Sequence, residues 1–259
     1  MSEATLIAKR QTELSALIWS SVPDSQPTPT TNIERWQRFV GPALLLKAVT
    51  SIESMVLLMP ERRTVDSFIL LRALYESVVT LAWIAINPTY RLNRLYTEFH
   101  TWHLREHEDW AKAGRPILTL DEAAESRAWL DAHRTGLPHV ADRAKNADRY
   151  WGARLTGWHP EASNMNDTRA LSSLRGLYRF IYSRGSQATH SHHRGLDPFV
   201  TVDDSTCALH REESPDSLIV WDLGLRVMLF GIGPAESTLG WPSYEKARGI
   251  MGTESAPSN

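Results

Sequence analysis

Long segments of the chain carry apolar residues at intervals of three and four, the spacing at which side chains share one face of an α-helix. Such segments run over 3–21, 32–59, 64–86, 90–112, 119–133, 168–190 and 217–231. Asn87-Pro88 ends the third of them, and Thr119 with Glu122 forms a capping box that opens the fifth. Strand-like alternation occurs only near 199–210, where it predicts a small β-hairpin. We therefore expect an all-α fold, an up-and-down helical bundle with irregular insertions.

Linkers divide the chain into three predicted parts. Residues 21–31, SVPDSQPTPTT, are rich in Pro, Ser and Thr, which is typical of a linker. An N-terminal helix and this linker occupy 1–31, the bundle domain occupies 32–236, and a C-terminal tail occupies 237–259. Within the bundle domain, residues 137–166 contain scattered Trp, Gly and Pro, so we expect an irregular loop there.

The segment from Phe68 to Ile86 is apolar on nearly every face, which is typical of a helix in the centre of a bundle. Arg72 and Glu76 stand in its middle, one turn apart, so they share a face. Charges inside a bundle cost free energy unless they are paired and hydrogen-bonded. The pair is therefore either a brace between neighbouring helices or the floor of a site, in which Arg72 orients Glu76 as a general base or ligand.

One face of segment 90–112 collects large apolar residues, namely Leu92, Leu95, Phe99 and Trp110. Stepping by about 100° per residue places Glu106 near the centre of this face, His103 beside it and His107 on its flank. Metal sites in bundles use carboxylates and imidazoles from facing helices, so Glu76, His103, Glu106 and His107 are candidate ligands for Fe, Mn or Zn. The alternative is that Glu106 meets an arginine and the histidines are solvated.

A polar stripe runs along segment 168–190 beside its apolar stripe, and consists of Arg175, Arg179, Tyr182, Ser186 and His190. Arginines that converge on a groove bind phosphate or carboxylate. Ser186 and His190 are one turn apart, within reach of each other as nucleophile and base, but no strained turn or oxyanion hole is visible. The alternative is a solvated flank that ends in a histidine-rich cap.

Composition narrows these possibilities only slightly. The net charge of -2 over 259 residues gives no global attraction to nucleic acid or anionic membrane. Cys207 is the single cysteine, so no internal disulfide forms, and together with a start unlike a signal peptide this favours the cytoplasm. Because Arg72 and Glu76 interrupt the segment long enough to span lipid, and we find no second segment of that length, we expect no membrane span. The chain carries no phosphate loop, dinucleotide fingerprint or zinc knuckle.

Four short motifs stand in order along the chain: R-A-L-Y-E (72–76), N-P (87–88), Y-W-G (150–152), and Y-R-F-I-Y with S-x-x-x-H-S (178–191). This order resembles a large family of uncharacterised bacterial helical proteins, known only as a domain of unknown function, over roughly residues 35–235. The resemblance implies an all-α fold and draws attention to Arg72, Glu76, Ser186 and His190. It implies no activity.

A looser similarity is to the HEPN superfamily of helical nucleotide-binding and ribonuclease domains. Those domains carry an arginine, four to six residues, and then a histidine near a helix start; here Arg184 and His190 enclose five residues. Gly185 stands where that family favours a polar residue. On one continuous helix Arg184 would point about 120° away from His190, so the match requires a break at Gly185, which glycine permits. Such domains usually dimerise, which implies a homodimer.

Three hypotheses of function follow. The first is a metal-independent, ribonuclease-like effector of the toxin or defence type, in which His190 is the acid or base and Arg184 or Arg179 holds the phosphate of RNA. The second is a helical metalloenzyme, similar to iron or manganese oxygenases. The third is a non-catalytic module that binds a small ligand or a partner. We favour the first because it combines the His190 region with a bundle scaffold.

Overall fold

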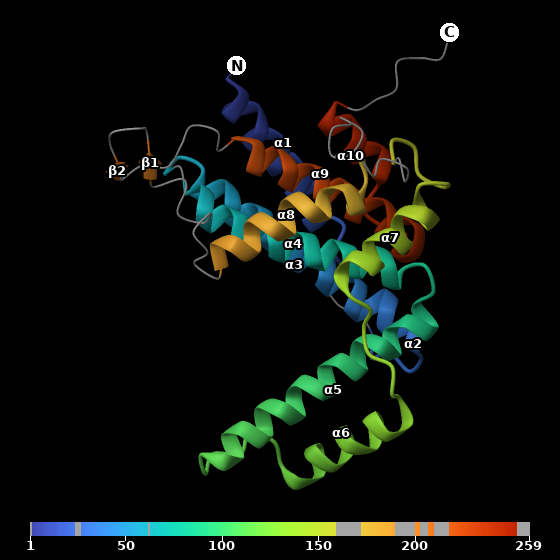
Figure 1. Cartoon of the computed structure of the whole chain (residues 1–259). Coiled ribbons are helices and arrows are strands. Elements are labelled where there is room, and N and C mark those ends of the chain that lie inside the picture. The colour runs from blue at the N-terminus through green and yellow to red at the C-terminus, as the bar shows by residue number, and fades with distance from the viewer. Residues whose placement is uncertain are drawn as a thin grey trace.

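The computed structural model of the protein describes residues 2–23, 27–61, 63–158, 172–189, 200–202, 207–209 and 218–252. Its helices are α1 (Glu3–Trp19), α2 (Asn32–Arg35), α3 (Gly41–Leu58), α4 (Thr64–Ile84), α5 (Pro88–Lys112), α6 (Leu120–Ala132), α7 (Val140–Trp151), α8 (Leu174–Thr189), α9 (Leu218–Leu239) and α10 (Tyr244–Met251), with a π-helical turn, η1 (Trp36–Val40), between α2 and α3. The all-α prediction is confirmed (Figure 1).

Helix α4 forms the centre of the body, and α3, α8 and α9 pack around it (Figure 1). Every residue from Ser77 to Ala85 is buried, as expected for a helix that is apolar on nearly every face. Buried tryptophans tie the helices to one another through their indole N–H groups. Trp151 of α7 donates to Ala82 O of α4 over 2.8 Å, and Trp221 of α9 donates to Met55 O of α3 over 2.6 Å.

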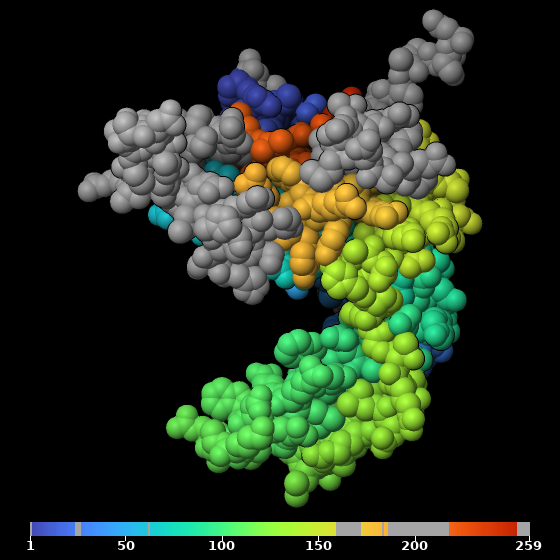
Figure 2. Space-filling view, viewed as in Figure 1, coloured from blue at the N-terminus to red at the C-terminus, as the bar shows by residue number. Residues whose placement is uncertain are grey.

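Helices α5 and α6 form an arm that projects from the body and leaves an open cleft beside α7 and α8 (Figures 1 and 2). The base of the arm is fixed where Arg91 Nη1 donates to Trp83 O over 2.7 Å. Farther out, Phe99, Trp102 and Trp110 are exposed. The apolar face predicted for this segment includes Phe99 and Trp110, and its burial is wrong at these two rings because α5 leaves the body and only the short α6 packs against its outer half.

Three segments differ in detail from the expected organisation. The irregular loop expected over 137–166 is wrong for its first half, because Val140–Trp151 is the helix α7. Strands β1 (Val200–Val202) and β2 (Cys207–Leu209) pair antiparallel within the span that predicts a hairpin. Helix α10 lies inside 237–259, and it packs against α9 and α1. The division at 31/32 and 236/237 stays a prediction.

By length and composition alone, three helical stretches among the described residues are long and apolar enough to cross a membrane: Asn32–Leu58, Thr64–Ala85 and Leu218–Leu239. Our statement that no second segment of this kind exists is therefore wrong. All three stretches pack against one another, which buries most of Thr64–Ala85 and Leu218–Leu239, whereas Asn32–Leu58 leaves Phe39 and Leu57 exposed. The absence of a membrane span stays a prediction.

Candidate functional site

A group of polar and aromatic side chains gathers where α4, α7 and α8 meet beside the cleft. We call this group the polar cluster; it consists of Arg72, Glu76, His139, Arg143, Tyr178 and Tyr182. Figure 2 shows side chains of α8 extending into the open space between the body and the arm. A ligand can reach this cluster, because His139 is exposed and the Glu76 side chain is 41% exposed.

Arg72 links α4 to α8. Its Nε donates to Glu76 Oε1 over 3.1 Å, and its Nη2 donates to the Tyr182 hydroxyl over 3.0 Å. The guanidinium carbon also lies 4.3 Å from the centroid of the Tyr182 ring. The side chain of Arg72 is 22% exposed and that of Glu76 is 41% exposed, so the pair borders solvent and is not sealed in the core.

Gly185 makes this meeting of α4 and α8 possible. A Cβ atom at Gly185 would lie 2.8 Å from Arg72 Cβ and 3.0 Å from Phe68 O, closer than a side chain can approach. Helix α8 runs without interruption through Gly185 to Thr189. Glycine therefore serves close helix packing at this position. The helix break that the HEPN similarity requires is absent at Gly185.

Arg143 of α7 places a second guanidinium in the polar cluster. Its Nη1 donates to Thr80 Oγ1, and Thr80 Oγ1 in turn donates to Glu76 O over 2.6 Å. Arg143 Nε is buried and has no hydrogen-bond partner among the described residues. Burial lowers the pKa of Arg143, while the carboxylates of Glu76 and Glu98 oppose that shift. Because the guanidinium is partly buried, its attraction to a nearby anion is screened less than that of a fully exposed arginine.

Two tyrosines of α8 form the aromatic part of the polar cluster. The rings of Tyr178 and Tyr182 stack with centroids 5.0 Å apart. The His139 ring lies edge-on to both, at 6.0 Å from Tyr178 and 6.3 Å from Tyr182. Nδ1 of His139 accepts from Ala141 N over 3.3 Å as the N-cap of α7, so a neutral ring carries its proton on Nε2. Burial raises the pKa of Tyr178.

Asp148 of α7 holds α8 in place behind the polar cluster. Its side chain is 2% exposed and accepts three hydrogen bonds, from Leu174 N (2.8 Å), Arg175 N (2.7 Å) and Trp158 Nε1 (2.7 Å). Two of these donors are the first amides of α8, so Asp148 caps that helix from a different element. Burial raises the pKa of Asp148 to about 6, against the opposing effect of its donors.

The predicted metal set is not brought together. Glu76 belongs to the polar cluster, whereas the other three residues lie on the arm. There, the ring of His103 packs against Phe99 at 4.0 Å, His107 Nδ1 accepts from Leu118 N over 3.1 Å, and Glu106 is exposed. No group of three or more His, Cys, Asp or Glu suited to a metal ion occurs among the described residues. The inward position that helical spacing gave Glu106 is wrong, because Glu106 is exposed on the arm.

The remaining candidates lie on or beyond α8. Arg179 and Arg184 are exposed on this helix, as is Arg175. Ser186 falls within α8, but its side chain and all of His190 lie outside the described residues. The sequence of α8 contains these three arginines and no acidic residue.

Sequence reasoning missed Arg143, His139 and Asp148. A signal for α7 exists, because its buried residues Val140, Ala144, Ala147, Asp148 and Trp151 follow helical spacing. The tryptophans and glycines around this segment are typical of an irregular loop, and they obscure the helical pattern of α7.

A family model matches residues 39–206, about two thirds of the chain, and its description is a family of unknown function (DUF5677). The chain belongs to this family, as the order of its motifs indicates. No curated protein and no solved structure matches the chain. None of these comparisons shows a similarity to the HEPN superfamily, so that resemblance stays a prediction.

Proposed function

We propose that this member of an uncharacterised family is a metal-independent, ribonuclease-like effector that binds single-stranded RNA in the cleft beside α8. The observation that carries the proposal is the composition of α8, which contains no acidic residue and exposes Arg175 and Arg179 on the same flank as the stacked pair Tyr178 and Tyr182. Proteins bind single strands with a positive groove and aromatic side chains on which bases stack. The local positive charge exists although the whole chain carries a net charge of -2.

The polar cluster supplies groups suited to a phosphodiester. Arg143 brings one guanidinium, which is held by Thr80, and Arg72 on α4 brings a second, which lies against Tyr182. Two guanidinium groups stabilise the charge that develops on phosphate oxygens during transfer. Arg175 and Arg179 of α8 then contact neighbouring phosphates of the strand.

Cleavage follows the usual course of metal-independent RNA scission. A base takes the proton from the 2′-hydroxyl, O2′ forms a bond to phosphorus, and the P–O5′ bond breaks as an acid gives a proton to O5′. The products are a 2′,3′-cyclic phosphate and a 5′-hydroxyl. We assign the base to Glu76, whose carboxylate Arg72 orients, and the acid to His139, which for this step is an imidazolium and has given up the hydrogen bond from Ala141 N. His190, the acid or base favoured from sequence, stays a prediction that a separate variant tests.

The experiment measures cleavage of a fluorescent single-stranded RNA in EDTA. We expect Glu76→Gln to lower the cleavage rate by about 100-fold or more, the usual contribution of a general base, and to leave RNA affinity nearly unchanged. Tyr178→Ala should weaken binding because it removes a stacking surface, and Tyr182→Ala should weaken it because Tyr182 holds Tyr178 and Arg72 in place. The matched control is Glu106→Gln, since Glu106 is an exposed glutamate of the arm.

Cleavage that persists in the Glu76→Gln, His139→Ala and His190→Ala variants would show that the nuclease is a contaminant. Loss of cleavage in EDTA, or in Glu106→Gln, would instead support the metalloenzyme hypothesis with Fe, Mn or Zn. The described residues give that hypothesis no group of ligands. Metal analysis of the purified protein tests it directly.

One observation favours a second candidate, a binding module without catalysis. Arg72 already donates to Glu76 and to Tyr182, so the pair resembles a brace that fixes α4 to α8. Under this reading the cleft binds RNA or another anionic ligand and releases it unchanged. Saturable RNA binding that needs Tyr182, with no product under any metal condition, would favour this candidate.

A further inference from the structure

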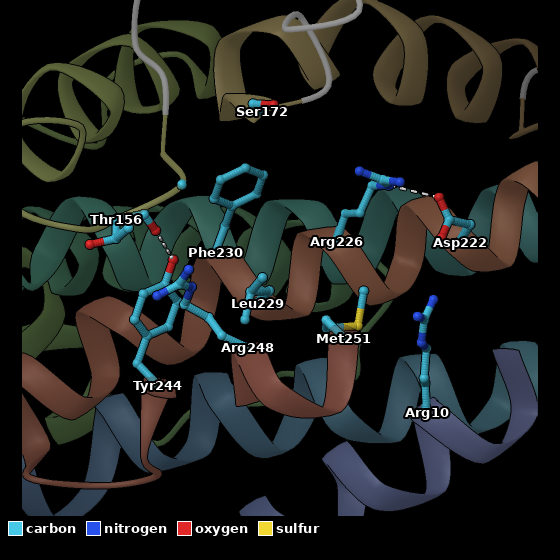
Figure 3. Close-up of a pocket in the computed structure, with 11 residues that line it drawn as sticks. Arg10, Thr156, Ser172, Asp222, Arg226, Leu229, Phe230, Tyr244, Arg248 and Met251 are labelled. Atoms are coloured by element: carbon cyan, nitrogen blue, oxygen red, sulfur yellow. Dashed lines mark hydrogen bonds and ion pairs between the residues drawn. The ribbon is translucent and has the colours of Figure 1, made fainter. Parts of the chain in front are cut away.

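A second hollow lies away from the cleft, between α1, α9, α10 and the loop after α7 (Figure 3). Its volume is about 180 Å³. No residue of the polar cluster lines it, and eight of its eleven lining residues fall outside 39–206, the part matched by the family model. The cavity is therefore built mainly from parts of this chain that the family model does not cover.

Positive charge dominates the polar lining of the cavity, with Arg10, Arg226 and Arg248 against the single carboxylate of Asp222. Arg226 Nε donates to Asp222 Oδ2 over 2.7 Å, and its two terminal nitrogens make no hydrogen bond to the described residues. The side chain of Arg248 is 8% exposed, and its ion-pair partner Glu245 is 75% exposed. The cavity therefore holds more positive than negative charge.

Helix capping explains two of these arginines but not the third. Arg248 lies in the last turn of α10, and Arg10 Nη2 lies 3.1 Å from the position of a Cβ at Gly252, just beyond that helix. Cations at a helix C-terminus are favourable, so both positions have a structural reason. Arg226 lies in the middle of α9, where no helix end is present, and it still lines the cavity. Arg226 is the residue that distinguishes a binding site from capping alone.

The apolar lining limits the kind of anion that fits. Leu229, Phe230 and Met251 line the part of the cavity that lies between the arginines (Figure 3). A cavity of about 150 Å³ with apolar walls can hold a benzene molecule. The space is thus sufficient for one aromatic ring, or a short aliphatic chain, with a charged group attached.

We infer that this cavity binds a small organic carboxylate whose apolar body is about the size of one ring. The carboxylate accepts paired hydrogen bonds from arginine, a geometry that planar guanidinium groups favour. The ring packs against Phe230, Leu229 and Met251. This site is independent of the proposed RNA cleft, because the two share no residue.

Benzoate is the probe, and benzyl alcohol is its neutral counterpart of similar shape. In calorimetric titration of the full chain, we expect saturable benzoate binding that is about tenfold or more tighter than benzyl alcohol binding, since a charged hydrogen bond contributes at least that much. Arg226→Gln should weaken benzoate binding by a similar factor. The side chain of Arg226 is 45% exposed, so the variant should fold normally, which far-ultraviolet circular dichroism checks.

Arg105→Gln is the matched control, because Arg105 is an exposed arginine of the arm and should leave benzoate binding unchanged. Equal binding of benzoate and benzyl alcohol would overturn the assignment, as would equal benzoate binding in Arg226→Gln and wild type. Saturable binding of inorganic phosphate without benzoate binding would overturn it too, since the apolar wall would then have no role. Failure of any of these tests leaves the RNA proposal unaffected, because that proposal rests on α4, α7 and α8.

Discussion

Two carboxylates at the junction of α4, α7 and α8 have opposite surroundings. Asp148 is 2% exposed and accepts three hydrogen bonds from other segments of the chain, two of them from the start of α8. The Glu76 side chain is 41% exposed and pairs with Arg72 of its own helix. The comparison shows that the costly buried charge maintains the structure, whereas the accessible charge is available to a ligand.

The difference lies in which parts of the chain each group connects. Asp148 joins α7 to the first amides of α8 and to Trp158, so its loss would affect tertiary structure. Glu76 and Arg72 are four residues apart on one helix, and such pairs contribute only a few tenths of a kcal/mol. Substitutions at the two positions should therefore differ strongly in their effect on stability.

The largest effect is expected for Asp148→Ala. The change leaves two backbone N–H groups and the Trp158 indole without an acceptor, and the free energy of unfolding should fall by about 4 kcal/mol. Urea denaturation measures this fall. The matched control is Asp142→Ala, an exposed aspartate of the same helix, which should cost less than about 1 kcal/mol. Equal effects of the two substitutions would show that Asp148 has no special structural role.

The next effect concerns the pH dependence of stability. The pKa of Asp148 is raised to about 6 in the folded state, from an ordinary value of 3.8. The folded protein therefore keeps this proton more strongly than the unfolded chain. The resulting contribution to the free energy of unfolding is about 3 kcal/mol. It is fully present below pH 3.8 and is lost as the pH rises through about 6.

Comparison of wild type with Asp148→Asn across this pH range isolates the contribution, because the variant has no proton to lose at this position. The difference in the free energy of unfolding between wild type and the variant should shrink as the pH rises. A difference that grows instead would mean that the three donors stabilise the ionised form more than burial disfavours it.

The smallest effect on stability is expected for Glu76→Gln. We expect a loss of about 0.5 kcal/mol, because the ion pair is partly exposed and lies within one helix. Thermal denaturation measures it, and Glu13→Gln, which breaks the exposed pair with Lys9, should give a similar value. A loss of several kcal/mol at Glu76 would make the pair a structural brace and would weaken its assignment as a general base.

Local rules predicted much of the helical framework. The end of α4 before Asn87-Pro88 and the capping box of Thr119 and Glu122 depend on neighbouring residues only, and both are present. The burial of α4 also follows from its composition. Periodicity could not reveal that α5 leaves the body, because an apolar stripe predicts a covered face but not the element that covers it.

The candidate site was predicted only in part for a related reason. Arg72, Glu76 and Tyr182 belong to segments whose polar residues interrupt clear apolar patterns. Arg143 and His139 belong to the site only because they contact residues distant in sequence, such as Thr80 and Tyr178. Those contacts are set by the packing of α7 and α8 on α4, which spacing within a single helix does not specify.

The arm acts as a long lever on a short base. Its 25-residue helix α5 extends about 37 Å at 1.5 Å per residue. A difference of about 10° in the direction of the arm at its base therefore corresponds to roughly 6 Å at its far end. The contacts at the base of the arm, in which Arg91 donates to Trp83 O, Asn32 donates to Asn93 Oδ1 and Arg94 donates to Gly136 O, therefore set the width of the cleft mouth.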